Sequence, residues 1–400
     1  MTSAMLNDHP TATPTASDTG PDALTLGVTD PRLAALTQRV NQSSQSRLIW
    51  LKFRRHRLAV VGGAVLVFLY LIALGAEFFS PQNPDTVNPR FAFAPPQSIH
   101  LFVDGPNGRE FNPHVLGLAS ERDPRTFKRT FVGNPKDVIP IRMFVKGEPY
   151  LLWGIIPASV KFIGPVDPSK KVFFWGADRM GRDMFSRVIT GTRLSMSVGL
   201  VGVFVSLALG LLLGGISGYF GGAVDTVIQR VIEVILSVPT IPLWMGMAAA
   251  VPASWSPLQV YFAVTIIISL ISWAALGREV RGRLLAMRHE EFVTAAWIDG
   301  CSEMRIIRRH MLPLLFSHVI ASATLAVPAM IIAETALSFL GIGLRPPIIS
   351  WGVLLQEAQN IQSVAAAPWL LIAPTVGVVS AILAFNFFGD GLRDAADPYS

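Results

Sequence analysis

Long uncharged apolar stretches alternate with short charged segments along most of this chain. Five of these stretches approach or exceed the roughly 20 apolar residues that one bilayer crossing takes. They are Leu58–Ala76, Leu194–Val224, Val234–Gly277, Val319–Ala333 and Ala358–Gly389. The third stretch is too long for one helix, and a proline- and serine-rich turn at 252–257 divides it into two spans. The fourth continues through Glu334 to Leu344, so the pattern predicts six spans.

The composition agrees with an integral membrane protein. Of the 400 residues, 51% are hydrophobic and 15% are charged, whereas a soluble domain carries about 25% charged residues. The net charge of +6 comes largely from arginines beside apolar stretches. Membrane orientation explains that placement better than nucleic-acid binding does, so no nucleic-acid partner is expected. The single cysteine, Cys301, excludes a disulfide within the chain.

Basic residues beside the first span predict the orientation. Arg47, Lys52, Arg54, Arg55 and Arg57 precede it, so the N-terminus is expected in the cytoplasm. With six spans the C-terminus and the 281–312 loop are cytoplasmic too, and that loop is rich in arginine. A second set of basic residues disagrees with this rule, because the predicted topology places them outside the cell membrane. They lie in a long external segment, where the rule is weak: Arg179, Arg182, Arg187 and Arg193.

The same pattern divides the chain. Residues 1–57 predict a cytoplasmic tail, mostly disordered, and 58–79 the first span. Residues 80–193 predict an external insert of mixed or irregular structure, with two short strands around Lys146-Gly147-Glu148. This insert is either a docking surface for another protein or an ordered loop. Its last part, 178–190, predicts an amphipathic interfacial helix with an Asp183–Arg187 pair.

Residues that could carry chemistry are sparse. The chain has no Gly-Lys dipeptide and therefore no phosphate-binding P-loop, and no catalytic residues stand out, so we expect no enzyme activity and no metal site. Two carboxylates, Glu233 and Glu334, fall in the spans. An intramembrane carboxylate suggests a functional site. The competing interpretation is a structural carboxylate held by a neighbouring helix or by Arg230.

Glycine and proline positions predict how two spans pack. Gly210, Gly214 and Gly218 recur at four-residue spacing, which gives a flat face for close helix contact. Pro239 and Pro242 are expected to kink the third span.

The charged segment 290–315 predicts two short helices. Glu290 to Asp299 can form the first, with Gly300 ending it. Ser302 can cap a second helix that runs to His310, and Pro313 then starts the next element. Small residues at 295, 296 and 300 would let another backbone come close. Spacing alone leaves two interpretations, an ordinary cytoplasmic loop or a surface that passes motion between a partner and the spans.

The spacing of this segment resembles the cytoplasmic motif of ABC importer permeases, E-A-A-x3-G-x9-I-x-L-P. Thr294 stands in place of the Glu and His310 in place of the Ile. Four other segments resemble the C-type subunit of the dipeptide, oligopeptide and nickel branch. They are "WGADRMGRDMFSRVITGTRLSMSVGL" (175–200), "GYFGGAVDTVIQR" (218–230), "AETALSFLGIGLRPPIISWG" (333–352) and "APWLLIAPTVGVVSAILAFNFFGDGLRDAADP" (367–398). The insert is larger than in short members, and Glu233 stands where Asp is expected. Both departures weaken any inference about substrate.

The resemblance implies an all-α fold of six spans, with a type I importer domain over residues 194–394 that holds the last five of them and a coupling segment at 281–313. It implies contact with an ATPase through Thr294, Ala295, Ala296, Gly300, His310, Leu312 and Pro313. Glu233, Glu334 and Pro239 would have gating or structural roles.

The implied partners are a B-type permease, two ATP-binding subunits and a periplasmic substrate-binding protein. The complex would import peptides or similar small solutes across a bacterial inner membrane, with its lipid around the spans. ATP and magnesium would bind to the partner ATPases, and no cofactor to this chain. The alternatives are an ion-coupled secondary carrier, a non-transporting scaffold, or the same family with nickel, opine or oligosaccharide as substrate.

Overall fold

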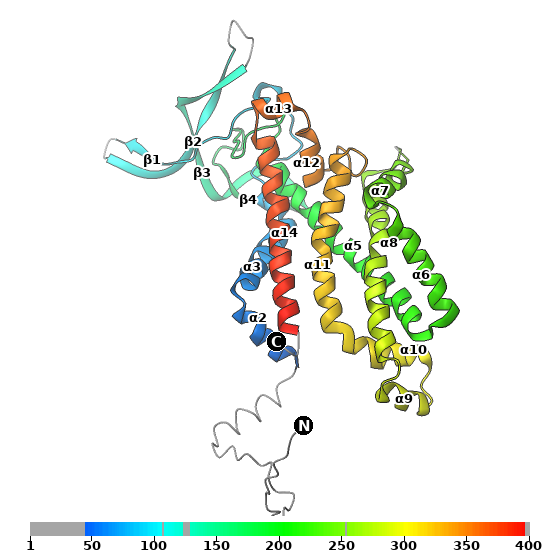
Figure 1. Cartoon of the computed structure of the whole chain (residues 1–400). Helices are drawn as coiled ribbons and strands as arrows, with labels where there is room; N and C mark the ends of the chain where they lie inside the picture. Colours follow the sequence, from blue (N-terminus) through cyan, green and yellow to red (C-terminus); the bar gives the residue numbers. More distant parts are fainter. Residues whose placement is uncertain (1–44, 106–107, 123–128, 253, 397–400) are drawn as a thin grey trace, which may run out of the picture. The chain divides into compact units, whose positions relative to one another are not determined.

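The computed structural model describes residues 45–105, 108–122, 129–252 and 254–396 (Figure 1). The disorder predicted for the N-terminal tail lies mostly outside these residues. The helices before the bent pair are α2 (Gln45–Arg55), α3 (Arg57–Leu74), α4 (Ala76–Phe79), the short 3-10 turn η1 (Pro89–Phe91) and α5 (Met184–Phe220). Those that follow are α6 (Gly222–Ser237), α7 (Thr240–Ala249), α8 (Pro257–Met287), α9 (Glu291–Ile298), α10 (Glu303–Arg305), the π-helical η2 (Ile306–Met311), α11 (Leu312–Phe339), α12 (Trp351–Glu357), α13 (Ile361–Ala366) and α14 (Trp369–Ala396).

Five helices in the described part of the chain are long and apolar enough to cross a membrane: α3, α5, α8, α11 and α14. A sixth crossing is possible only if α6 and α7 act as one span, and they meet at an angle of 92°. Pro239 precedes the first residue of α7, and Pro242 lies in its first turn. The predicted kink is therefore confirmed, and it is a sharp bend. Its physical cause is that proline cannot donate the backbone hydrogen bond that continues a helix.

The structure corrects the start of the second span. The predicted interfacial helix at 178–190 is wrong, because α5 runs unbroken from Met184 for 37 residues. The boundary expected at 193/194 therefore falls inside a helix. Asp183 is the N-cap, and its carboxylate accepts a 2.9 Å hydrogen bond from the Ser186 backbone N–H. The predicted Asp183–Arg187 pair is also wrong, since Asp183 is occupied by this cap. Burial raises the pKa of Asp183 to about 6.

The insert forms a four-stranded antiparallel sheet in the order β1-β2-β3-β4. Its strands are β1 (His100–Gly105), β2 (Gly108–Arg122), β3 (Arg129–Leu152) and β4 (Ile156–Pro165). The turn predicted around Lys146-Gly147-Glu148 is wrong, because those residues lie within β3. A Cβ on Gly147 would come within 2.6 Å of the Lys161 side chain on β4. The glycine therefore permits a close cross-strand contact and does not mark a turn.

The predicted glycine face is confirmed in the crossing of α5 and α8. Gly210, Gly214 and Gly218 are buried, and all three face α8. A Cβ on Gly214 would lie 2.4 Å from the carbonyl oxygen of Gly277 and 3.0 Å from its Cα. The two backbones are thus in direct contact, so a side chain at this point cannot be accommodated by rotating a neighbouring one.

We expect Gly214→Leu to separate α5 from α8 and to lower the thermal stability of the purified protein. Overpacking a close-packed site costs about 1–3 kcal/mol, and a backbone clash lies at the upper end. Gly282→Leu on α8 is the matched control, because no atom lies within 4 Å of its added Cβ. Melting in detergent should show a lower midpoint for Gly214→Leu alone, and equal midpoints would contradict the packing described.

Candidate functional site

The first helix of the charged segment ends as its sequence predicts. Gly300 has a φ of +74°, the left-handed conformation that glycine adopts without strain. The Cys301 N–H donates to the Ala296 carbonyl at 3.1 Å and the Gly300 N–H to the Trp297 carbonyl at 3.0 Å. These two bonds form a Schellman motif, which ends α9 and turns the chain sharply.

The second helix differs from the prediction. Ser302 has the extended backbone of an N-cap, but its side chain makes no cap hydrogen bond. The expected stop at His310 is wrong, because α10 passes into the π-helical η2 and then directly into α11. Pro313 falls in the first turn of α11, where a missing N–H is tolerated. The segment is therefore rigidly continuous with a membrane-spanning helix, and π-helical turns of this kind are frequent at functional sites.

Burial divides the motif residues into two groups. Thr294, Ala295, Gly300 and Pro313 are exposed, whereas His310 and Leu312 are half-buried. Ala296 is only 6% exposed and packs in a cluster with Val293, Ile306 and Ile307. Ala296 is therefore covered within this chain, and its contact with an ATPase stays a prediction. Its size lets α9 pack closely against η2 within this chain.

Two large apolar side chains that the motif does not include complete this surface. Trp297 is 64% exposed and Ile298 is 72% exposed. Trp297 and Thr294 line a hollow together with Tyr219 at the end of α5 and Arg288 after α8. Exposed apolar groups on an otherwise charged segment mark an interaction surface. The sequence could have indicated these exposed side chains. The buried face of an eight-residue helix needs fewer apolar residues than α9 has in Phe292, Val293, Trp297 and Ile298, so some of them must be exposed.

The two intramembrane carboxylates differ in their surroundings. Glu334 is fully buried, and its Oε1 accepts hydrogen bonds of 2.8 Å from the hydroxyls of Ser338 and Ser350. Ser350 also caps α12, so Glu334 joins α11 to α12. Glu233 is exposed and pairs with Arg230 Nη1 at 2.8 Å, as the structural interpretation expected. The contact of Glu233 is thus the one expected of a structural group, whereas the Oε2 atom of Glu334 is buried without a hydrogen-bond partner.

A buried ion network that the sequence did not reveal joins the start of α5 to the end of α12. Arg187, 1% exposed, lies 3.2 Å from Asp178 and 3.0 Å from Glu357. Arg182 pairs with the same two carboxylates at 2.6 and 2.9 Å. Sequence reasoning could not find this network, because Glu357 is 170 residues away from Arg187. Arg193 pairs separately with Glu77, so three of the four arginines expected outside have acidic partners.

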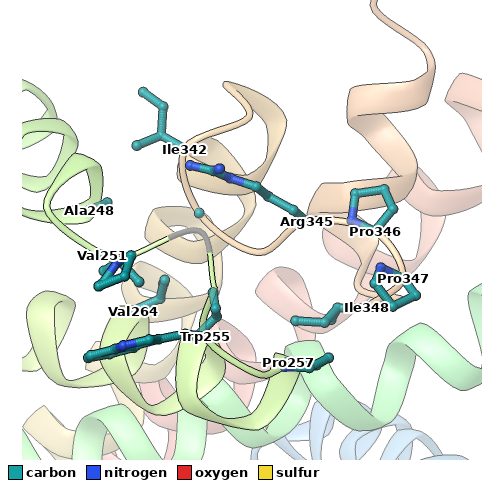
Figure 2. Close-up of a pocket in the computed structure, with 13 residues that line it drawn as sticks. Ala248, Val251, Trp255, Pro257, Val264, Ile342, Arg345, Pro346, Pro347 and Ile348 are labelled. Carbon is teal, nitrogen blue, oxygen red and sulfur yellow. The ribbon is translucent and has the colours of Figure 1, made fainter.

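A pocket of about 210 Å³ lies between the α7–α8 turn and the loop that joins α11 to α12 (Figure 2). Its walls are apolar and include Val251, Trp255, Val264 and Ile348. Arg345 is the one charged residue that lines it, and its guanidinium extends across the pocket in Figure 2. Such a site suits a molecule that combines an apolar group with a carboxylate. The described residues contain no cluster of His, Cys, Asp or Glu able to hold a metal ion.

Comparison with known proteins identifies the family. Two protein-family models match the sequence. Residues 210–399 match the family "binding-protein-dependent transport system inner membrane component". Residues 44–96 match the family "N-terminal TM domain of oligopeptide transport permease C". The oligopeptide transport system permease protein OppC of Haemophilus influenzae is 40% identical over 225 residues, which cover 56% of this chain and 70% of the relative. This chain belongs to the C-type permeases of peptide ABC importers.

Other relatives of this permease agree. The dipeptide transport system permease protein DppC of Alkalihalophilus pseudofirmus is 37% identical over 58% of this chain and 73% of its own length. OppC of Escherichia coli K12 is 39% identical over 56% of this chain and 72% of its own. A MetNI methionine ABC transporter structure covers 54% of this chain and 98% of its own, with 19% identity and a TM-score of 0.44. The family models and the curated relatives, together with the long apolar helices, make this permease a multi-pass inner-membrane protein of the ABC importer class.

Proposed function

We propose that this permease forms one half of the solute path of an ATP-driven peptide importer, and that a B-type permease forms the other half. Two ATP-binding subunits would bind ATP and magnesium, and this chain would bind no cofactor. The observation that carries the proposal is the exposed surface of α9, which combines motif residues with two large apolar side chains on a segment rigidly joined to α11. We name this surface the α9 surface: Thr294, Ala295, Trp297, Ile298 and Gly300.

In this proposal the α9 surface lies in a groove of one ATPase. Closure of the ATPase pair would move α9, and the cluster formed by Val293, Ala296 and Ile306 would pass that motion to η2. Because η2 continues into α11 without a break, α11 would move as well. Leu312 is packed against the same cluster at this junction. His310 and Pro313 lie within two residues of Leu312 along the chain, so we assign the second half of the motif to the junction between η2 and α11.

We infer that both termini and the α9 surface face the cytoplasm, while the sheet faces the periplasm. Four basic residues before α3 and Arg57 at its first position support this orientation. Arg182, Arg187 and Arg193 at the opposite end form ion pairs with acidic side chains, which reduces their weight as orientation signals. A substrate-binding protein would then release its cargo on the side of the sheet.

The names of the relatives and the pocket beneath Arg345 both favour peptides as the solute. A peptide presents a terminal carboxylate and, in many cases, apolar side chains. The guanidinium of Arg345 and the apolar walls around Trp255 match those two features. Nickel, opines and oligosaccharides are the competing solutes, and each can be offered in the same uptake assay.

Uptake into liposomes tests the energy source. We expect the purified complex of both permeases and both ATPases to take up peptide only with ATP, and an uncoupler to leave that uptake unchanged. Glu334→Gln removes the charge but keeps an oxygen that can accept from Ser338 and Ser350, so this variant should also depend on ATP alone. Uptake that needs a proton gradient would establish the carrier alternative.

A further inference from the structure

The turn between β3 and β4 presents an apolar, uncharged tip. No charged residue occurs in the stretch 149–160. The exposed fractions are 54% for Leu151, 52% for Trp153, 79% for Ile155 and 57% for Ile156. A soluble loop tip normally carries polar residues, and a contiguous group of large apolar side chains marks a surface that contacts something other than water.

Specific contacts fix this tip at the end of the first membrane span. The indole Nε1 of Trp153 donates a 3.0 Å hydrogen bond to the carbonyl of Leu74, the last residue of α3. The guanidinium of Arg193 on α5 lies 4.5 Å from the centre of the Trp153 ring. Arg193 also donates to the Ala73 carbonyl at 2.8 Å. The tip is therefore level with the end of α3, where the hydrocarbon region of the bilayer gives way to headgroups.

The tip continues an exposed apolar face of α3. Val67, Phe68, Leu71 and Leu74 are each more than half exposed on α3, although the helix is a membrane span. These side chains lead along the helix to the residue that Trp153 contacts. Tryptophan is enriched at membrane–water interfaces, where its apolar ring and its polar N–H find different surroundings.

The backbone of the tip supports a functional role. Trp153 has a φ of +58°, and Gly154 follows with a φ of +71°. A left-handed conformation is unfavourable for a residue with a side chain, and such strain is typical of functional positions. The turn consists of Trp153, Gly154 and Ile155 between paired Leu152 and Ile156, and Ile155 is its most exposed apolar side chain. Nothing within 4 Å would meet a side chain at Gly154, so packing does not explain the conformation.

We propose that the β3–β4 tip inserts into the lipid interface beside α3 and anchors the sheet to the bilayer. The occupant of this surface is phospholipid, at the boundary of headgroups and acyl chains. The inference rests on α3 and α5 as membrane spans and does not depend on which solute the permease carries. Its consequence is that the sheet is held at a fixed height above the membrane.

A spin label at the apex tests this proposal in the assembled transporter. Cys301 is the only cysteine of this chain, so Ile155→Cys in a Cys301→Ser background, assembled with cysteine-free partner subunits, places one nitroxide at the tip. The complex with its partner subunits is placed in nanodiscs of phosphatidylcholine and phosphatidylglycerol. Collision with oxygen, which partitions into lipid, is compared with collision with a water-soluble nickel chelate. We expect oxygen collisions to exceed nickel collisions several-fold.

Phe111→Cys in the same background is the control, because Phe111 is 69% exposed on β2 and lies outside the tip. The nickel chelate should collide with this label more often than oxygen does. Equal nickel collision at 155 and 111 would place the tip in water and overturn the proposal. Protection of 155 from both reagents would assign the tip to a protein partner, and spin–spin broadening would assign it to a second copy. Either result would overturn lipid insertion.

Discussion

Trp297→Ser should sharply reduce ATP-driven uptake while the permease remains folded in the membrane. The indole is 64% exposed, so its loss removes little packing within this chain. If the α9 surface docks on the ATPase, the same indole is buried in the complex. A central aromatic in an interface contributes about 2 kcal/mol or more, which is about 30-fold in affinity. Co-purification of the ATPase and uptake into liposomes should fall together.

Trp50→Ser on α2 is the matched control for this change. Trp50 is also an exposed tryptophan, at 57%, but lies outside the α9 surface. We expect this variant to retain the ATPase and most of the uptake. Wild-type co-purification in Trp297→Ser, or an equal loss in Trp50→Ser, would show that the exposed indole of α9 has no specific role in docking.

Arg187→Met should lower the stability of the bundle more than any other single loss of an ion pair described above. The substitution keeps an unbranched apolar chain but leaves the buried carboxylates of Asp178 and Glu357 with one cation, Arg182. Removing one partner of a buried ion pair costs about 3–5 kcal/mol, because the other charge stays buried. Because Arg182 still pairs with both carboxylates, we expect the loss of stability to lie toward the lower end of this range. Thermal unfolding of the purified protein should show a clearly reduced midpoint.

Arg230→Met tests the same substitution in an exposed pair. Its guanidinium pairs with Glu233, and the two side chains are 76% and 51% exposed. Pairs of this kind contribute about 0–1 kcal/mol, so the melting midpoint should stay close to that of the wild type. If both variants melt alike, the network around Arg187 does not hold α12 against α5.

The membrane part was largely predictable from the sequence, because apolar length and proline position report directly on helices in lipid. The bend at Pro239, the glycine face around Gly214 and the end of α9 at Gly300 all follow from backbone chemistry at single residues. The predicted interfacial helix was wrong because its apolar positions continue the buried face of α5. An amphipathic pattern does not distinguish a surface helix from the first turns of a span.

The remaining differences from the prediction arose where distant residues determine the local structure. Gly147 resembles a turn residue until Lys161 on the neighbouring strand is known to cross it. Ala296 resembles an exposed small residue until η2 is folded against α9. The Arg187 network depends on Glu357, which only the fold brings near. In each case the residue type is conspicuous in the sequence. Its role, however, depends on a contact with a residue elsewhere in the chain, which no local sequence pattern specifies.

The most direct test of the proposed coupling is a photo-crosslinking amino acid at position 297 in the assembled transporter. If α9 docks on the ATPase, irradiation should give a covalent adduct between this permease and an ATP-binding subunit, identified by mass spectrometry. The same probe at position 50 should give no such adduct. An adduct to the substrate-binding protein would invert the proposed orientation, and the absence of any ATPase adduct from position 297 would contradict the assignment of the α9 surface.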